Sequence, residues 1–419
     1  MYSALEVISY SSEPITDYNS RKFNLDLAGP RVLLSSDSMI DLILKTGINQ
    51  YMEFKSVDSS FVSDAQGKLR GVPDSRSAIF KDRTLSLPEK NQLMKFFKLV
   101  QGHFGNDNDE DNISQQDLES PFGEFLSKMG LSHKLKSYTS IFFTFSLCFS
   151  VRLFCTLADY DQDNVEICKD VINTKSGINR LALYHSSIGR FPNANGAIIY
   201  PIYGQGELPQ AFCRCAAVKG CIYVLRMPIV SVLMDKVASS HDVSLTDARR
   251  MVARGICITK NSMKTEVANN LVFFPPKSLY PEQITSVRVL QLSSNVAACP
   301  SGIFVTYLSA MCDNEVEGKK SLNSAIKALF SVPISGNSEN CATDSLHTQA
   351  KPSFLEHVFH GAFDSISYTP MPDKHLHYNH LLDATEKLFK EIYPSEEFFP
   401  MASGASDEHL DDNGSELDS

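Results

Sequence analysis

The stretch YPIYGQGELPQAFCR, residues 200–214, contains a Gly-x-Gly pair that could bind phosphate. Backbone N–H groups at such a turn can cradle an anion when a helix follows. Here Glu207 follows the second glycine directly, and Pro209 has no N–H group to donate. A dinucleotide-binding fingerprint would place glycine at position 209, within a strand–turn–helix unit. We therefore predict that this turn holds no nucleotide cofactor.

The same stretch predicts a helix with one polar face. Pro209 suits the first turn of a helix, and Glu207 suits the positive end of the helix dipole. At helical spacing Glu207, Gln210 and Arg214 form one polar stripe. The residues expected on the inward side are Leu208, Phe212 and Cys215. The stripe is either an ordinary solvated face or a recognition surface that meets both acidic and basic groups.

A group of histidines and the cysteines are the other side chains that could bind metal or react. His375, His377 and His380 lie close in sequence, but no acidic residue stands at ligand spacing, so we expect them to be solvated. The ten cysteines form no Cys-x-x-Cys pair, and those at 213, 215 and 221 match no zinc motif. We expect reduced thiols that act as small buried apolar side chains, and no metal site.

The composition is typical of a globular protein with an acidic surface. The chain has 419 residues, 43% of them hydrophobic, and a formal net charge of −10. That charge argues against a protein that binds nucleic acid through phosphates, and it favours basic partners. Tryptophan is absent, so aromatic anchors must come from 26 Phe and 15 Tyr. The apolar run at 141–151 is too short for a membrane span, which needs about 20 residues.

Hydrophobic periodicity predicts the elements that position these residues. A helix is expected over residues 37–47, ended by Gly47, with an apolar face formed by Met39, Ile40, Ile43 and Leu44. Residues 51–73 alternate like a hairpin with its turn at Gln66-Gly67. Further helices are expected over residues 86–104, 177–191, 321–331 and 380–393, and strands over residues 221–234, 254–260, 270–276, 286–292 and 302–308.

These elements predict an α/β fold, with mixed α+β character, in which a helical domain interrupts a sheet domain. Residues 105–117 are expected to form a solvated acidic loop. The expected division is a loose lead-in at 1–20, sheet domain at 21–74, a mainly helical domain at 75–191, the sheet domain again at 192–400, and a disordered acidic tail at 401–419.

Several longer motifs resemble one protein superfamily, that of the Rab escort proteins and Rab GDP-dissociation inhibitors. YPIYGQGELPQAFCR followed by GCIYVLRMPI resembles its Rab-binding stretch, and FNLDLAGPRVLL with LILKTGINQYMEFK resembles a second shared block. The ending KLFKEIYPSEEFFP is similar to escort proteins, and LESPFGEFLSKMG and ADYDQDN resemble plant-type escort proteins. The resemblance extends from about residue 23 to residue 400.

The resemblance implies a fold shared with FAD/NAD(P)-binding oxidoreductases but used without a flavin, with a helical second domain. It implies a non-catalytic subunit of Rab geranylgeranyltransferase. Such a protein binds GDP-bound, unprenylated Rab, presents the Rab to the transferase heterodimer, and delivers the geranylgeranylated Rab from the cytosol to membranes. The alternatives are a Rab GDP-dissociation inhibitor, and, on fold kinship alone, a flavin-dependent oxidoreductase.

The resemblance also assigns site residues. It places a Rab-binding platform at Tyr203, Glu207, Gln210, Arg214, Ile222 and Val224, the last two on a strand after the helix. It assigns Arg190 and Ile198 to binding of the C-terminal segment of Rab. Tyr184 is assigned to the transferase-facing side of the helical domain, with ordinary core packing as the alternative.

The chain departs from the family pattern at three places. The family begins with a strand and a glycine-rich turn that open a βαβ unit, whereas this chain starts near the second shared block. A phenylalanine-rich run stands at 137–157, and the region before residue 252 is shortened. We expect a missing central strand, an exposed sheet edge and an incomplete Rab platform. Our hypothesis is an alternative or misassembled transcript product.

Overall fold

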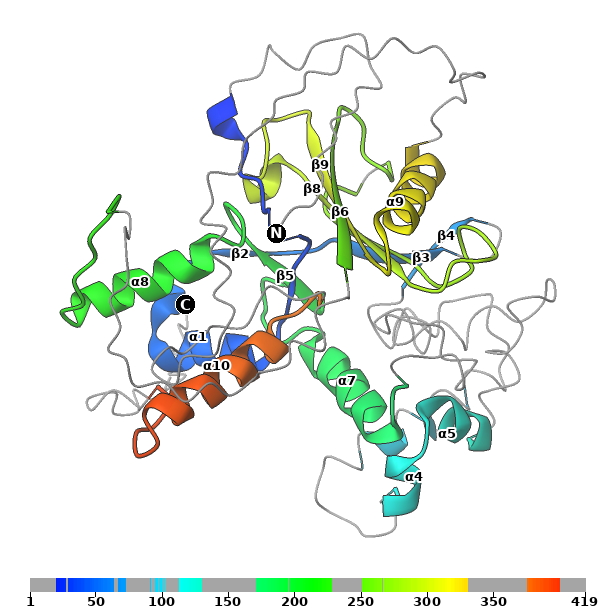
Figure 1. The fold of residues 1–419 in the computed structure, drawn as a ribbon, viewed down its shortest axis with the longest axis horizontal. Coiled ribbons are helices and arrows are strands. Elements are labelled where there is room, and N and C mark those ends of the chain that lie inside the picture. The colour runs from blue at the N-terminus through cyan, green and yellow to red at the C-terminus, as the bar shows by residue number, and fades with distance from the viewer. Residues whose placement is uncertain are drawn as a thin grey trace, which may run out of the picture.

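The computed structural model describes residues 20–27, 29–63, 67–72, 113–129, 171–194, 196–227, 251–265, 267–330 and 375–399, with scattered positions between 91 and 102. Several expectations lie outside these residues, among them the lead-in, the run at 141–151, the predicted strand at 228–234 and the acidic tail. The described elements form two sheets with helices packed against them (Figure 1). The mixed α/β fold class predicted from the sequence is confirmed.

Six strands form the larger sheet, in the order β4-β3-β7-β8-β9-β6. They are β3 (Ser59–Ser63), β4 (Leu69–Gly71), β6 (Met251–Thr259), β7 (Asn270–Phe274), β8 (Val287–Leu292) and β9 (Phe304–Cys312). β3 and β7 run parallel, and the other neighbouring strands are antiparallel. The central strands β7, β8 and β9 are buried almost throughout, because both faces of the sheet are covered. The predictions for β6 to β9 are confirmed.

The two faces of the larger sheet have different partners. Successive strand residues point to opposite faces, so Phe274 packs toward α9 (Glu315–Phe330) while Phe273 belongs to the core shared with the smaller sheet. Helix α9 comes close to the sheet because Gly318 has no side chain. A Cβ at that position would lie 2.7 Å from the Cβ of Ala253 on β6.

The smaller sheet has three antiparallel strands in the order β1-β5-β2. They are β1 (Leu33–Leu34), β2 (Phe54–Ser56) and β5 (Ile198–Pro201). The central strand β5 connects two cores. Ile198 and Tyr200 enter the core of the larger sheet, and Ile199 packs with α1 (Ser38–Thr46) and α8 (Glu207–Val218) on the other side.

Residues 51–73 do not form the single hairpin that their alternation predicts. β3 and β4 pair as expected, with Phe61 opposite Gly71, but β2 belongs to the other sheet. The chain changes sheets between β2 and β3. The N–H of Val57 donates to Ile198 at 2.9 Å, and the N–H of the next residue, Asp58, donates to Asn269 at 3.0 Å. Alternation alone predicted strands here but could not assign them to a sheet.

Helix α1 begins and ends as predicted. The side chain of Asp37 caps its start by accepting from the N–H of Met39 at 3.2 Å. Gly47 ends the helix with a φ of 71°, and its N–H donates to Leu44. The predicted apolar face is only partly buried, since Ile40 and Ile43 lie in the core while Leu44 is exposed.

Three more helices correspond to predicted ones. α7 (Thr174–Ser187) begins before the expected residue 177, α9 begins before residue 321, and α10 (Asn379–Ile392) agrees with the prediction. By contrast, residues 221–227 form no strand, so that prediction was wrong. There the chain leaves α8 through a tight turn and remains exposed, as described below.

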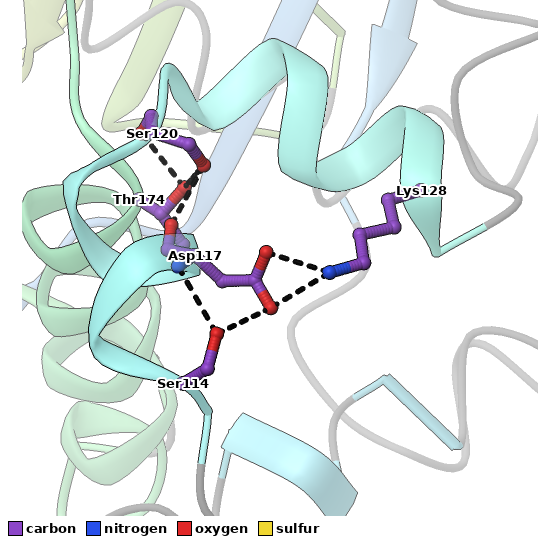
Figure 2. Close-up of polar contacts among 5 residues, drawn as sticks. All are labelled: Ser114, Asp117, Ser120, Lys128 and Thr174. Atoms are coloured by element: carbon purple, nitrogen blue, oxygen red, sulfur yellow. Dashed lines mark hydrogen bonds and ion pairs between the residues drawn. The ribbon is translucent and has the colours of Figure 1, made fainter.

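Helices α4 (Gln115–Glu119), α5 (Phe122–Lys128) and α7 share a separate apolar core that includes Phe122, Leu126 and Ile178. Polar contacts beside this core link α4 to α5 and α7 (Figure 2). Ser114 caps α4 and donates to the Asp117 carboxylate at 2.8 Å, and Lys128 of α5 contacts the same carboxylate at 2.7 Å. These contacts lower the pKa of Asp117 below its usual value. Residues 115–117, which were expected to belong to the acidic loop at 105–117, lie in α4. That part of the expectation was wrong.

A glycine allows α7 and α5 to pack closely, and we predict that Gly177→Ala lowers the stability of the helical core. A Cβ at Gly177 would lie 2.5 Å from a ring carbon of Phe122, which is almost fully buried. Such overpacking costs about 1–3 kcal/mol, more than alanine gains in helix propensity. The unfolding free energy should fall by about 1–2 kcal/mol in urea denaturation.

The matched control is Gly123→Ala in α5, where a Cβ would meet nothing within 4 Å. That variant should be as stable as the parent or slightly more stable. Equal losses in the two variants would contradict the close-packing explanation.

Candidate functional site

The turn between β5 and α8 contains the Gly-x-Gly pair. Tyr203 and Gly204 adopt left-handed φ values of 72° and 103°, whereas Gly206 has an ordinary φ of −61°. A side chain at position 204 would also crowd Asp26, because a Cβ there would lie 3.1 Å from the carboxylate. Only the first glycine is therefore required by backbone geometry. The strained Tyr203 is anchored by its N–H, which donates to Val296 at 3.0 Å.

The amide groups at the start of α8 are already used. The N–H of Glu207 donates to Gly204 and that of Leu208 donates to Gln205, both at 3.2 Å, and Pro209 has no N–H. The carboxylate of Glu207 itself lies at the positive end of the helix. The described turn thus offers no cradle for a phosphate, and it presents an acidic group instead.

A half-buried carboxylate, Asp26, holds this turn in place. It accepts from the N–H of Gln205 at 3.0 Å and from the hydroxyl of Tyr200 on β5. Its own N–H donates to the hydroxyl of Tyr307 on β9 at 3.0 Å. Burial raises the pKa of Asp26, and the bonds from Tyr200 and Gln205 oppose part of that rise. Burial also raises the pKa of Tyr200, so its hydroxyl stays protonated and donates.

The side chain of Gln205 ties the turn to two other segments. Its amide nitrogen donates to the carbonyl of Arg31 at 2.7 Å, and its amide oxygen accepts from the hydroxyl of Tyr378 at 2.5 Å. The guanidinium of Arg31 lies 5.3 Å from the centre of the Tyr378 ring and donates to the carbonyl of His377 at 3.1 Å. Three segments that are far apart in the sequence therefore meet at one buried glutamine.

The polar stripe of α8 has the predicted geometry. Leu208 and Ala211 are buried, while Gln210 and Arg214 are exposed and Glu207 is partly exposed. The amide of Gln210 lies 3.4 Å from the carboxylate of Glu207. Tyr203, at the head of the stripe, has 60% of its surface exposed. The structure thus places three of the predicted platform residues on one accessible face of α8 and leaves a fourth, Tyr203, exposed in the turn before it.

The other two predicted platform residues lie in the exposed segment after α8. Gly220 ends the helix with a φ of 96°, and the N–H groups of Gly220 and Cys221 donate to Ala217 and Ala216 at 3.0 and 2.9 Å. This is the Schellman arrangement, which ends the helix and satisfies two of its last carbonyl groups. Ile222 is 87% exposed and Val224 is 68% exposed. Both are accessible, although not on the strand that we expected.

The positions assigned by resemblance to other contacts differ in accessibility, since Arg190 is exposed, Tyr184 is half-buried and Ile198 is buried. Arg190 forms an ion pair with Asp41 at 2.7 Å and donates to the carbonyl of Ser35 at 2.7 Å. Ile198 is only 7% exposed and lies in the core, so its side chain reaches no partner in this conformation. Tyr184 is half-buried against the same core, which favours the packing alternative for that residue. The roles assigned to these residues stay predictions.

The remaining candidate groups form no recognisable metal site in the described part of the chain. The rings of His375, His377 and His380 lie close together, with centroid separations of 5.8 and 5.1 Å from His375. His375 and His377 are half-buried rather than solvated as expected. Cys213 and Cys221 are exposed, which corrects the expectation that the thiols are buried. Among the described helices, none has the length and apolar character of a membrane span.

Sequence reasoning missed Asp26, Gln205 and Tyr378. The only available signals were an acid between two leucines in FNLDLAGP and a glutamine inside the Gly-x-Gly pair. Neither signal indicates which residues come into contact, because Gln205 lies 179 residues from Asp26 and 173 from Tyr378 in the sequence.

Comparison with known proteins connects this site to a family. The sequence profile of the family described as GDP dissociation inhibitor matches residues 9–336. The chain belongs to this family. It is 44% identical to Rab escort protein 1 of Arabidopsis thaliana, over all of this chain and 82% of that protein. It is 28% identical to Rab proteins geranylgeranyltransferase component A 2 of Mus musculus, over 91% of this chain and 62% of that protein.

The fold agrees with the family assignment. The structure is similar to the crystal structure of a Rab GDI from Plasmodium falciparum, with a TM-score of 0.64 over 92% of this chain and 86% of that one. The sequence identity is 16%, so this likeness concerns the fold alone. The superfamily resemblance drawn from the motifs is confirmed.

We predict that Asp26→Ala destabilises the protein. The substitution removes the acceptor from the Tyr200 hydroxyl and the Gln205 N–H. A buried donor without an acceptor costs about 1–3 kcal/mol, so the unfolding free energy should fall by about 2–4 kcal/mol. Asp26→Asn, which keeps one acceptor, should lose less. Chemical denaturation of both variants gives the comparison.

We also predict that the difference in unfolding free energy between the parent and Asp26→Asn depends on pH. Because the pKa of Asp26 is higher in the folded protein than in the unfolded chain, its contribution to stability is full below about pH 4 and declines as the pH rises. The parent should therefore be most stable relative to Asp26→Asn at low pH, with the difference shrinking toward pH 7. If the difference in unfolding free energy does not change with pH, the pKa of Asp26 is not raised in the folded protein.

Proposed function

We propose that this chain is a Rab escort protein, which binds GDP-bound, unprenylated Rab and presents it to Rab geranylgeranyltransferase. Support comes from its identity of 44% over its whole length to a protein of that name. A second relative is named as a component of the transferase. The chain's own part in this proposal is binding; the bond-making step belongs to the transferase.

The observation that carries the proposal is the accessible face of α8. Glu207 and Arg214 offer charges of both signs on a rigid helix, and the turn before the helix exposes the aromatic ring of Tyr203. Complementary charges orient a partner, and an aromatic side chain held in one conformation loses little entropy on binding. The exposed Ile222 and Val224 add apolar contact area next to the stripe. Such a surface suits a protein partner better than a small molecule.

Escort activity follows from binding alone. A Rab held on this surface has its C-terminal tail tethered at a high effective concentration near the transferase active site. The transferase then needs no strong recognition of the tail sequence. After transfer, each buried CH₂ of the geranylgeranyl chain contributes about 0.8 kcal/mol, so an apolar groove would keep the prenylated Rab in the cytosol until transient contact with a membrane.

Two alternatives make different predictions. A Rab GDP-dissociation inhibitor would bind prenylated Rab without supporting the transferase. A flavin-dependent oxidoreductase would need a dinucleotide cradle, and in the described β5–α8 turn the N–H groups of Gln205, Glu207 and Leu208 are engaged in hydrogen bonds within the protein. Between the escort and the inhibitor, the 44% identity to Rab escort protein 1 favours the escort function.

We predict that Glu207→Arg weakens the binding of GDP-loaded, unprenylated Rab by about 30-fold or more, since a contact residue at the centre of an interface contributes about 2 kcal/mol. Calorimetry or fluorescence titration measures the affinity. The matched control is Glu124→Arg, because Glu124 is an exposed acid in the first turn of α5, as Glu207 is in α8. The control reverses the same charge within the first turn of another helix, so equal losses would contradict a specific role for α8.

A transfer assay separates the escort from the inhibitor. We predict that purified chain, added to the transferase, unprenylated Rab and geranylgeranyl diphosphate, makes Rab prenylation depend on its concentration. The reason is that the transferase receives its substrate only as the Rab complex. Rab binding without any stimulation of prenylation would instead favour the inhibitor. An absorption spectrum of the purified chain tests the flavin alternative.

A further inference from the structure

The exposed ring of Tyr203 takes its direction from the backbone that carries it. The residue is 60% exposed, so packing alone does not fix the ring. Its φ of 72° lies in the left-handed region, which tyrosine rarely adopts, and such a conformation persists only when surrounding contacts hold it. One of these contacts is the hydrogen bond from the N–H of Tyr203 to the carbonyl of Val296 at 3.0 Å. The position of that carbonyl therefore affects where the ring points.

Val296 is the last residue of a short 3-10 turn, η6 (Ser294–Val296), which follows β8 in the chain. Ser293 caps this turn by accepting from the N–H of Asn295 at 3.3 Å. Ala297 ends it with a φ of 54°, a second left-handed residue that is not glycine. Two strained backbones, those of Tyr203 and Ala297, therefore lie on either side of the Val296 carbonyl, and the shape of η6 decides whether both can be held.

One buried asparagine bridges two residues of this turn. The side-chain oxygen of Asn269 accepts from the N–H of Ser293 at 3.1 Å, and its amide nitrogen donates to the side-chain oxygen of Asn295 at 2.9 Å. The hydroxyl of Ser293 donates to the same Asn295 oxygen at 2.5 Å. An amide group can do this because it has an acceptor and a donor side by side. The conformation of η6 therefore depends on Asn269, whose side chain is fully buried.

Asn269 is itself held through both of its backbone groups. Its N–H donates to the carboxylate of Asp58 at 2.8 Å, and its carbonyl accepts from the N–H of Asp58 at 3.0 Å. The N–H of Ala268 donates to the same carboxylate at 3.1 Å. Asp58 lies where the chain passes from β2 to β3, so its own position is fixed by both sheets. A continuous series of hydrogen bonds thus connects Asp58, through Asn269 and η6, to the backbone of Tyr203.

The residues at the end of η6 also hold a second part of the site. The side chain of Asn24 donates to the carbonyl of Ala297 at 2.7 Å, and the N–H of Asn24 donates to the carbonyl of Ala298 at 3.0 Å. Asn24 stands two residues before Asp26, whose carboxylate accepts from the N–H of Gln205. The β5–α8 turn is therefore connected to η6 by two separate routes, one through Tyr203 and one through Asp26.

We propose that Asn269 is a positioning residue for Rab binding, which acts through η6 to orient the ring of Tyr203. This inference rests on the proposed function, in which Tyr203 contacts Rab. Asn269 cannot touch a partner itself, because its side chain is fully buried. A ring that is already oriented loses less conformational freedom when a partner immobilises it, so affinity depends on the support beneath it. Removal of the Asn269 amide leaves every exposed platform residue unchanged but releases the ring.

Fluorescence of a single tryptophan tests the positioning without any Rab. The chain contains no tryptophan, so Tyr203→Trp introduces one indole at this position. Adding Asn269→Ala should lower the anisotropy of the indole and increase its quenching by acrylamide, because the ring becomes more mobile. Asn295→Ala is a second variant, since it removes the same hydrogen bond from an exposed residue and should fold even if Asn269→Ala does not. It should have the same effect on the indole.

The matched control is Asn270→Ala in the same tryptophan background. Asn270 is as buried as Asn269, but its amide nitrogen donates to Val267 at 3.4 Å rather than to η6. The control should leave anisotropy and quenching unchanged, and circular dichroism shows that each variant is folded. Unchanged anisotropy in a folded Asn269→Ala or Asn295→Ala protein would overturn the proposal. An equal change in the control would overturn it as well.

A double-mutant cycle then measures the effect on Rab. Asn269→Ala should weaken the binding of GDP-loaded, unprenylated Rab by about five- to tenfold, as expected for one lost hydrogen bond. In a Tyr203→Gly background, which has no ring to orient, the same substitution should change the affinity by less than about twofold. Equal losses in both backgrounds would show that Asn269 does not act through Tyr203. If the parent protein binds no Rab, the proposed function is wrong, while the fluorescence still decides whether Asn269 positions the ring.

Discussion

The hydrogen bonds accepted by one carboxylate determine the geometry of the candidate site. Asp26 receives the Tyr200 hydroxyl and the Gln205 N–H, and through its own N–H it contacts Tyr307. These bonds connect the segment before β1 to strands of both sheets and to the turn that begins α8. The left-handed backbone at Tyr203 and Gly204 persists because the surrounding contacts over-determine it. The direction of α8, and hence of its polar stripe, depends on this arrangement.

The two sheets explain why such a turn can be rigid. Strand β5 is central in the smaller sheet, and its alternate side chains enter two different cores. A strand fixed on both faces holds its end in place, so the turn that follows it has little freedom. Helix α8 adds Leu208 and Ala211 to one of these cores and leaves the opposite face in solvent. The result is a polar surface supported by a dense apolar base.

The segment after α8 is built on a different principle. Residues 222–227 belong to no helix or strand, and their apolar side chains stand in solvent. A single turn of two backbone hydrogen bonds and one glycine ends the helix before this segment. The polar stripe of α8 is the rigid half of this surface, and it can recognise a partner. The apolar segment at 222–227 belongs to no helix or strand, so its conformation can change more easily.

The sequence by itself determined the local elements and the family. Apolar periodicity located α1, α8, α10 and the strands β6 to β9, because a half-buried element must repeat its apolar residues with its own period. Spacing of three and four residues also predicted the stripe of Glu207, Gln210 and Arg214. The YGQGELPQ motif pointed to the family, although the reason for its first glycine, a φ of 103° beside Asp26, came only with the fold.

Only the tertiary structure decided which distant residues meet. Asp26, Gln205 and Tyr378 carry no periodic signal, because each acts through a single contact with a far part of the chain. The sheet to which β2 belongs was decided by the hydrogen bonds of Val57 and Asp58, and the fate of residues 221–227 by the turn at Gly220. Periodicity reports that a face is buried but not what covers it. The contacts that give this protein its site depend on chain packing, which local sequence does not encode.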